Sequence, residues 1–331
     1  MDKVAIIGKQ QPMVFRKKMK DFLDSKGYPA DLLDMETRNA ADWTDKLRGY
    51  SAVISCGEKF PASVFEDLDG SLKLISRYGV GTDEIDKAAA AEHGVAVCNA
   101  AGTLSTAVAE CAMGLIICLL RRLPDADKEV RAGDWSRFFE SKTGRQIEGK
   151  TVGLIGFGDI AKALARMLSG FNCKILAYDL IWDEKTAKAL NVEYATVDRI
   201  QKEADIISLH VPSTPETNGM INKEFLKGMK NSAVLINTGR GKLIVEEDLA
   251  EALRTKEIAA AGLDVFCKEP PDADNPLLTL PNVMLLPHCG AGTDECLERA
   301  GDMAAQNVAD FFDGKTVKTI LNPNYIKQGE K

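Results

Sequence analysis

The chain has 331 residues, of which 45% are hydrophobic, and its formal net charge at pH 7 is −7. This length is enough for two domains of ordinary size, each with its own hydrophobic core. A negative charge without a long basic run argues against nucleic acid and anionic membrane surfaces as partners, whereas a small anionic substrate needs only one or two local arginines.

The first hundred residues alternate short apolar runs with helical patterns. Strands are expected at 4–8, 52–55, 72–78 and 95–99, and helices at about 12–25, 62–68 and 84–92. This alternation predicts a doubly wound parallel sheet. The third run leads into the glycine-rich turn Arg77-Tyr78-Gly79-Val80-Gly81-Thr82-Asp83, where backbone N–H groups can hold an anion.

A long helix is expected at 103–120. Its most apolar part is about ten residues long, whereas a membrane span needs about twenty. The charged stretch 121–149 follows and contains Trp135, Phe138 and Phe139. Aromatic residues among charges suit a subunit contact, and a helix that covers the edge of the sheet is the alternative.

A glycine pattern follows the next apolar run. Residues 151–155 lead into Gly156-x-Gly158-x-x-Ala161, and a second run at 174–179 ends in Asp179. A strand that turns through such glycines into a helix presents backbone N–H groups to a pyrophosphate, and an acid about twenty residues later binds a ribose 2′-hydroxyl. The pattern therefore predicts a dinucleotide site. Because Asp179 repels a 2′-phosphate and Leu180-Ile181-Trp182 offers no arginine, NAD is favoured over NADP.

Further strands and helices predict a second doubly wound sheet with at least six strands. The strands are expected at 205–210, 233–238, 260–264 and 283–286, and the helices near 184–190, 197–203, 222–228 and 246–254. An amphipathic helix at 293–312 closes the chain. If this helix returns to the first sheet, residues 1–100 plus 292–331 form a substrate-binding domain, residues 101–291 form the NAD-binding domain, and a cleft lies between them.

Three polar segments follow late strands, at the edge where open α/β sheets bind ligands. They contain Arg240, Glu269 and His288. Hydride exchange between nicotinamide and a 2-hydroxy acid needs a cation for the carboxylate, a base for the hydroxyl proton and a group that tunes the base. These residues supply one of each. Among the other histidines, His93 is expected in a solvated turn, and His210 is expected to be structural or to line the adenine side.

The eight cysteines form no Cys-x-x-Cys pair and no spacing typical of metal ligands. We therefore predict no metal site, reduced thiols and a cytoplasmic protein. Cys289 lies beside His288 and is expected to be a packing residue.

These segments, in this order, resemble those of the D-isomer-specific 2-hydroxyacid dehydrogenases over almost the whole chain, and most of all the phosphoglycerate dehydrogenase branch. The matching segments are Arg77-Tyr78-Gly79-Val80-Gly81-x-Asp83, Val108-Ala109-Glu110, Gly156-x-Gly158-x-x-Ala161, Asp179, His210-Val211-Pro212-x-Thr214-Pro215-Glu216-Thr217, Asn237-Thr238-x-Arg240-Gly241, Gly262-x-Asp264-Val265-Phe266-x-x-Glu269-Pro270 and Pro287-His288-x-Gly290.

The resemblance implies an NAD-dependent oxidoreductase that acts on the CH–OH group of a small 2-hydroxy or 2-oxo acid. His288 would be the acid/base, Glu269 would hydrogen-bond it and raise its pKa, and Arg240 would bind the substrate carboxylate. On the substrate side, the implied residues are Arg77, Tyr78, Val80 and Gly81, with the N–H groups of Val80 and Gly81 completing the carboxylate pocket. On the cofactor side, the predicted residues are Thr106, Gly156, Gly158, Asp159, Ile160, Asp179, Val211, Pro212, Thr217, Thr238, Asp264, His288 and Gly290.

The family also implies a homodimer, with 121–149 as the contact. One departure concerns the substrate. Phosphoglycerate dehydrogenases carry a basic residue for the phosphate in a Val-Arg-Ser stretch, and this chain has Val53-Ile54-Ser55 instead. Lys59 or Arg77 are candidate substitutes.

The expected substrates are therefore, in order, 3-phosphoglycerate, hydroxypyruvate, glyoxylate and pyruvate. A hydroxypyruvate/glyoxylate reductase and a D-lactate dehydrogenase-like enzyme are the alternatives to a phosphoglycerate dehydrogenase-like enzyme. A different class, the NADH-sensing co-repressors, shares this fold and these three residues, but the compact acidic chain argues against it.

Overall fold

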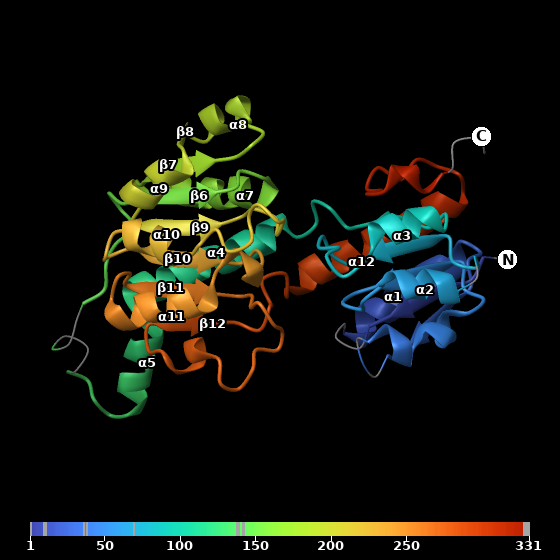
Figure 1. Ribbon diagram of the computed structural model, residues 1–331, viewed down its shortest axis with the longest axis horizontal. Helices are drawn as coiled ribbons and strands as arrows, with labels where there is room; N and C mark the ends of the chain where they lie inside the picture. The colour runs from blue at the N-terminus through green and yellow to red at the C-terminus, as the bar shows by residue number, and fades with distance from the viewer. Residues whose placement is uncertain are drawn as a thin grey trace. The chain divides into compact units, whose positions relative to one another are not determined.

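A computed structural model describes residues 2–8, 12–35, 37, 39–68, 70–136, 140 and 143–326. The chain divides into two compact units: unit 1 is Met1–Leu104 with Gly292–Lys331, and unit 2 is Ser105–Ala291. Each unit contains one sheet in which all strand pairs are parallel (Figure 1). The predicted fold class, two doubly wound parallel-sheet domains, is confirmed.

Unit 1 has the strand order β2-β1-β3-β4-β5. The strands are β1 (Val4–Ile7), β2 (Ala30–Leu33), β3 (Ala52–Ser55), β4 (Leu74–Arg77) and β5 (Ala96–Cys98). Helices α1 (Met13–Ser25) and α12 (Asp294–Phe312) pack on one face, and α2 (Ala62–Asp67) and α3 (Lys87–Glu92) on the other. Because both faces are covered, the central strands are apolar at successive positions rather than at alternate ones.

Unit 2 has the strand order β12-β11-β10-β9-β6-β7-β8, and these strands lie side by side in Figure 1. They are β6 (Thr151–Ile155), β7 (Lys174–Tyr178), β8 (Val192–Tyr194), β9 (Ile206–Leu209), β10 (Val234–Asn237), β11 (Ala260–Leu263) and β12 (Val283–Leu285). One face packs on α4 (Ser105–Arg121), α7 (Asp159–Leu168) and α8 (Glu184–Ala189), and the other on α9 (Val197–Glu203), α10 (Lys223–Gly228) and α11 (Glu246–Thr255).

The strand order fixes where each sheet can bind a ligand. In unit 2 the chain builds β6, β7 and β8 outward in one direction and then returns to build β9 to β12 in the other. The loops after β6 and β9 therefore diverge and leave a crevice at the carboxyl ends of the strands. In unit 1 the same reversal lies between β1 and β3.

Strands β2 and β8 are not predicted by the sequence, and both lie at the edge of a sheet. Only Ala30 in β2 and Val192 in β8 are buried. An edge strand buries few side chains, so its apolar pattern is weak.

Helix α5 (Leu123–Arg131) has no buried residue, and Trp135 after it is 78% exposed. These residues belong to the stretch for which a subunit contact is predicted, and the homodimer stays a prediction. Phe138 and Phe139 lie outside the described residues. Among the described helices, none combines the length and the apolar character that crossing a membrane requires.

Candidate active site

The glycine-rich turn of unit 2 joins β6 to α7. Gly156 has φ +97°, and a Cβ atom there would lie 2.6 Å from the carbonyl carbon and oxygen of His210. Only glycine fits this position. At Gly158 the φ angle is −77°, and a Cβ atom would meet no atom within 4 Å. The protein itself does not require glycine here, so the open space suits close approach by a phosphate at the start of α7.

Asp179 follows β7 and faces this turn. Its Oδ2 atom accepts a hydrogen bond of 2.6 Å from the N–H of Phe157, and its Oδ1 accepts one of 2.9 Å from the N–H of Ile181. The carboxylate thus fixes the glycine-rich turn as well as its own loop. Each carboxylate oxygen can accept a further hydrogen bond, so the predicted contact with a ribose hydroxyl remains open to it.

The segment after β9 begins with His210. This side chain is partly buried, and its Nε2 atom is fully buried without a hydrogen-bond partner among the described residues. Burial lowers the pKa of His210 to about 4, so the ring is neutral at pH 7. Farther along, the Thr217 hydroxyl donates to the carbonyl of Pro212 at 2.6 Å and accepts the N–H of Thr214 at 2.8 Å. Thr217 therefore holds the loop in shape.

Arg240 lies in the turn after β10. Asn237 organises this turn: its Nδ2 donates to the carbonyl of Arg240 at 2.9 Å, and its Oδ1 accepts the N–H of Gly239 at 3.0 Å. A Cβ atom on Gly241 would lie only 1.9 Å from the carbonyl carbon of Phe266. The missing side chain at Gly241 thus lets the Arg240 turn touch the segment that leads to Glu269. Thr238 has a buried hydroxyl without a partner in the described part of the chain.

Asp264 binds the segment that carries His288. Its carboxylate oxygens accept the N–H groups of Cys289 and Gly290, both at 2.8 Å, and its carbonyl accepts the N–H of His288 at 2.8 Å. Asp264 is 1% exposed, and burial raises the pKa of its carboxyl group. His288 has φ +55°, which costs a residue other than glycine about 1 kcal/mol. The three hydrogen bonds offset that strain.

Glu269, which follows β11, and His288, which follows β12, form a hydrogen-bonded pair. The His288 Nδ1 atom lies 2.7 Å from the Glu269 Oε2 atom, and Glu269 Oε1 accepts the N–H of Phe266 at 3.2 Å. The His288 side chain is 52% exposed. Because an ionised carboxylate only accepts, Nδ1 carries the hydrogen, and Nε2 can accept or donate a proton on the exposed side.

Cys289 corrects one expectation. Its side chain is exposed, so it is not a packing residue. Partial desolvation of the sulfur and the nearby Asp264 carboxylate raise the pKa of this thiol, which disfavours a reactive thiolate.

The predicted substrate loop of unit 1 follows β4. Three hydrogen bonds hold its carbonyl groups: Ala100 N–H to Gly79 at 2.8 Å, Asn99 Nδ2 to Val80 at 2.8 Å, and Arg77 Nε to Gly81 at 3.0 Å. The N–H groups of Val80 and Gly81 make no hydrogen bond within the described residues.

Tyr78 is buried in unit 1, and its hydroxyl donates to the carbonyl of Leu297 at 2.6 Å. Its side chain therefore joins the loop to α12. Asn99 was not among the predicted residues, although it fixes the Val80 carbonyl.

Three predicted cofactor residues lie near helix starts in unit 2. Asp159 is the exposed first residue of α7, Ile160 follows it and is partly buried, and Thr106 is exposed in the first turn of α4. Val211 packs partly against the core, and Pro212 is exposed. Their cofactor contacts stay predictions.

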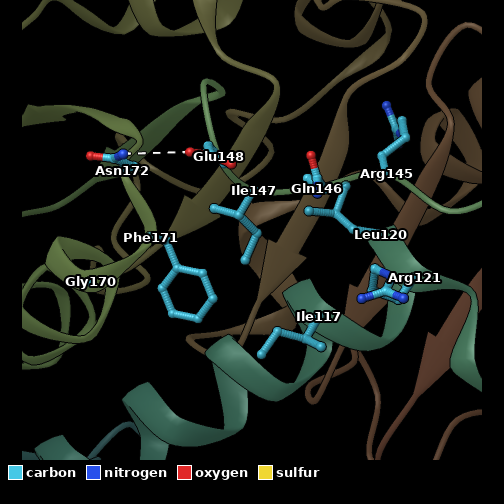
Figure 2. A pocket seen from close by; sticks show the side chains of 10 residues that line it. All are labelled: Ile117, Leu120, Arg121, Arg145, Gln146, Ile147, Glu148, Gly170, Phe171 and Asn172. Carbon is cyan, nitrogen blue, oxygen red and sulfur yellow. Dashed lines mark hydrogen bonds between the residues drawn. The ribbon is translucent and has the colours of Figure 1, made fainter.

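A pocket with a volume of about 420 Å³ lies elsewhere in unit 2, and Figure 2 shows its lining. It is formed by the end of α4 and by residues 145–148 and 170–172, which precede β6 and β7. This is the amino end of the sheet, whereas open α/β sheets bind their ligands at the carboxyl ends. None of the predicted site residues lines it.

Comparisons with known proteins identify the family of the chain. Residues 113–290 match the family model described as D-isomer specific 2-hydroxyacid dehydrogenase, NAD binding domain. The chain is 38% identical over 286 residues to a glyoxylate reductase from Korarchaeum cryptofilum, covering 86% of each protein. It is 39% identical over 277 residues to a D-3-phosphoglycerate dehydrogenase from Methanocaldococcus jannaschii, covering 83% of this chain and 52% of that protein.

Among solved structures, D-lactate dehydrogenase with NAD+ from Lactobacillus jensenii has a TM-score of 0.79 and 29% sequence identity, with 96% of this chain and 99% of that one covered. The family model of an NAD binding domain and the structural likeness to a D-lactate dehydrogenase with NAD+ give the cofactor as NAD. The chain therefore belongs to the D-isomer-specific 2-hydroxyacid dehydrogenase family and is an NAD-dependent oxidoreductase that acts on CH–OH donors.

Proposed function

We propose that the protein interconverts a small 2-oxo acid and its D-2-hydroxy acid, with His288 as the acid/base. The observation that carries this proposal is the 2.7 Å contact between His288 Nδ1 and Glu269 Oε2 in a side chain that is 52% exposed, which leaves Nε2 for the proton transfer. Bound NADH supplies the hydride. His288 in its protonated form donates a proton from Nε2 to the oxygen of the 2-oxo group as that oxygen gains charge.

Glu269, Asp264 and Arg240 have separate roles around His288. Glu269 stabilises the positive charge on His288 through a charge-assisted hydrogen bond. Asp264 holds the backbone of Cys289 and Gly290 and thereby positions the imidazole. The Arg240 guanidinium, in the turn that touches the Phe266 segment, binds the carboxylate of the substrate.

In unit 1, the N–H groups of Val80 and Gly81 are proposed to bind a carboxylate group. Their lack of partners among the described residues supports the proposal, because a bound carboxylate would satisfy both. The cofactor contacts proposed for the glycine-rich turn rest on the open space at Gly158 and on Asp179.

The two finer alternatives are a phosphoglycerate dehydrogenase-like enzyme and a glyoxylate or hydroxypyruvate reductase. They differ in whether the substrate carries a phosphate group. Relatives with either name match the chain at similar identity. The sequence predicted 3-phosphoglycerate as the first candidate substrate. A choice between a phosphorylated and an unphosphorylated substrate therefore has to rest on the residues of this chain.

The test is NADH oxidation with glyoxylate, hydroxypyruvate, pyruvate and 3-phosphohydroxypyruvate. We expect turnover with at least one of them and a loss of about 10²- to 10⁴-fold in His288→Asn, because the general acid is removed. His93→Asn is the matched control, since His93 is an exposed histidine of unit 1. Retained NADH binding without turnover on any acid would reject the enzyme in favour of an NADH-sensing binding protein.

A further inference from the structure

A buried acid lies in the loop after β3. Glu58 is 5% exposed, and its Oε2 atom accepts hydrogen bonds from the N–H groups of Cys56 at 2.9 Å and Gly57 at 3.1 Å. Consecutive N–H groups that converge on one point form a site for an anion. In this chain the anion is the carboxylate of Glu58 itself.

The strand order places this loop where unit 1 can bind a ligand. The sheet reverses direction between β1 and β3, so a crevice is expected at the carboxyl end of β3, directly before Cys56. The loop is also joined to the one that follows β4. Phe60 N–H donates to the carbonyl of Glu84 at 2.8 Å, and Asp86 N–H donates to the carbonyl of Phe60 at 2.9 Å. Glu58 therefore belongs to the same edge of the sheet as Val80 and Gly81.

Backbone N–H groups hold the charge of the Glu58 carboxylate. Among the described residues, no lysine or arginine forms an ion pair with Glu58. Of the two candidate phosphate ligands, Lys59 is exposed, and Arg77 donates its Nε–H to the carbonyl of Gly81. A phosphate that entered here would meet occupied N–H groups and a carboxylate of the same sign.

We propose that Glu58 sets the substrate class of the enzyme: its carboxylate fills the anion site after β3 and so restricts turnover to 2-oxo acids without a phosphate group. This inference rests on the proposed function, in which unit 1 takes part in binding the substrate. Glu58 acts on the distal end of the substrate and takes no part in the proton transfer of His288. The enzyme is thus a reductase of glyoxylate-like or hydroxypyruvate-like acids.

The experiment compares hydroxypyruvate with 3-phosphohydroxypyruvate, which differ only in the phosphate, in the wild type and in Glu58→Ala. We expect the wild type to favour hydroxypyruvate in kcat/KM by about 100-fold or more, since an unpaired desolvated charge is strongly rejected. Glu58→Ala frees both N–H groups. It should raise kcat/KM for the phosphorylated acid at least about tenfold, mainly through KM, and change that for hydroxypyruvate by less than about threefold.

Two further variants sharpen the result. Glu58→Gln removes the charge and can still accept both N–H groups, so its ratio of kcat/KM values should lie between those of the wild type and Glu58→Ala. If Glu58→Ala does not fold, Glu58→Gln decides alone. Glu66→Gln removes an exposed acid from α2 in the same unit and should leave the ratio at the wild-type value. An unchanged ratio in the Glu58 variants, or a wild type that prefers the phosphorylated acid, would overturn the proposal.

Calorimetric titration with inorganic phosphate separates this inference from the proposed function. Tighter phosphate binding by at least about tenfold in Glu58→Ala supports an anion site after β3, even in a protein that reduces none of the acids. Equal phosphate affinity in both proteins refutes it, even in a protein that reduces hydroxypyruvate.

Discussion

Replacement of Gly158 by alanine should separate cofactor binding from folding. The added Cβ atom meets no atom within 4 Å, and the φ angle of −77° suits alanine. Alanine gains about 0.4–1 kcal/mol from the smaller entropy of its unfolded chain. Alanine lowers the free energy of unfolding by a similar amount because it is a poor residue at a helix N-cap. We therefore expect the free energy of unfolding to stay within about 1 kcal/mol of the wild type.

Cofactor binding should respond differently. A methyl group at residue 158 occupies the space through which a pyrophosphate reaches the N–H groups at the start of α7. Losing one charge-assisted hydrogen bond costs about 1.5–3 kcal/mol, which corresponds to roughly 10- to 100-fold weaker binding. Fluorescence titration gives the NADH dissociation constant, and urea unfolding gives the stability of the same protein.

Gly156→Ala is the contrasting variant. Its Cβ atom would lie 2.6 Å from the backbone of His210 at φ +97°, so we expect a loss of stability of about 3 kcal/mol. A Gly158→Ala protein that is fully stable and binds NADH within twofold of the wild type would refute the assignment of this turn to the pyrophosphate. An unimpaired Gly156→Ala protein would refute the close approach of the turn to His210.

Three further predictions concern unit 2. In Gly241→Ala the new Cβ atom would lie 1.9 Å from the carbonyl carbon of Phe266, so the turn or the Phe266 backbone must move by about 1 Å or more, and kcat/KM should fall about 10²-fold. Gly239→Ala is the control, because the nearest atom to its Cβ would be 3.5 Å away. Equal kcat/KM values in the two variants would contradict the packing argument. Asp179→Asn removes one negative charge, which at roughly 4 Å in water repels a doubly charged 2′-phosphate by about 2 kcal/mol. The preference for NAD over NADP in kcat/KM should therefore fall about 30-fold, and an unmoved preference would place the ribose elsewhere. Burial lowers the pKa of His210 to about 4, so between pH 7 and pH 5 the unfolded chain takes up a proton that the folded chain does not. The free energy of unfolding should therefore fall by roughly 2 kcal/mol over this range. In His210→Asn, the urea midpoints at the two pH values should lack this part of the loss.

Local patterns in the sequence were enough to predict the fold class and to name candidate groups for the site. Alternating apolar runs and helical periods predict parallel sheets because each period reflects the geometry of a single element. The glycines of the turn at 156–158 and the acid at residue 179 are recognisable for the same reason. In the structure, Gly156 has no room for a side chain, and Asp179 accepts the N–H of Phe157.

The arrangement around His288 could not be derived from local patterns in the sequence; only the family resemblance implied the contact between Glu269 and His288. The Glu269 carboxylate reaches His288 across 19 residues of chain, and the Asp264 carboxylate reaches Gly290 across 26. These contacts exist because β11 and β12 are neighbours in the sheet, and no local pattern records which strands pair. The positive φ angle of His288 is likewise visible only in the folded chain.

Glu58 shows the same division in unit 1. In the sequence it is one acid of a short polar loop, and nothing in Cys56-Gly57-Glu58 distinguishes it from a solvated surface residue. The tertiary structure buries its carboxylate on two N–H groups at the carboxyl end of β3. Local sequence therefore determined the fold class, the central strands and the candidate groups of the site, because periodicity and turn chemistry act over a few residues. Tertiary structure alone decided which groups meet, because strand pairing brings together residues that are far apart in the chain.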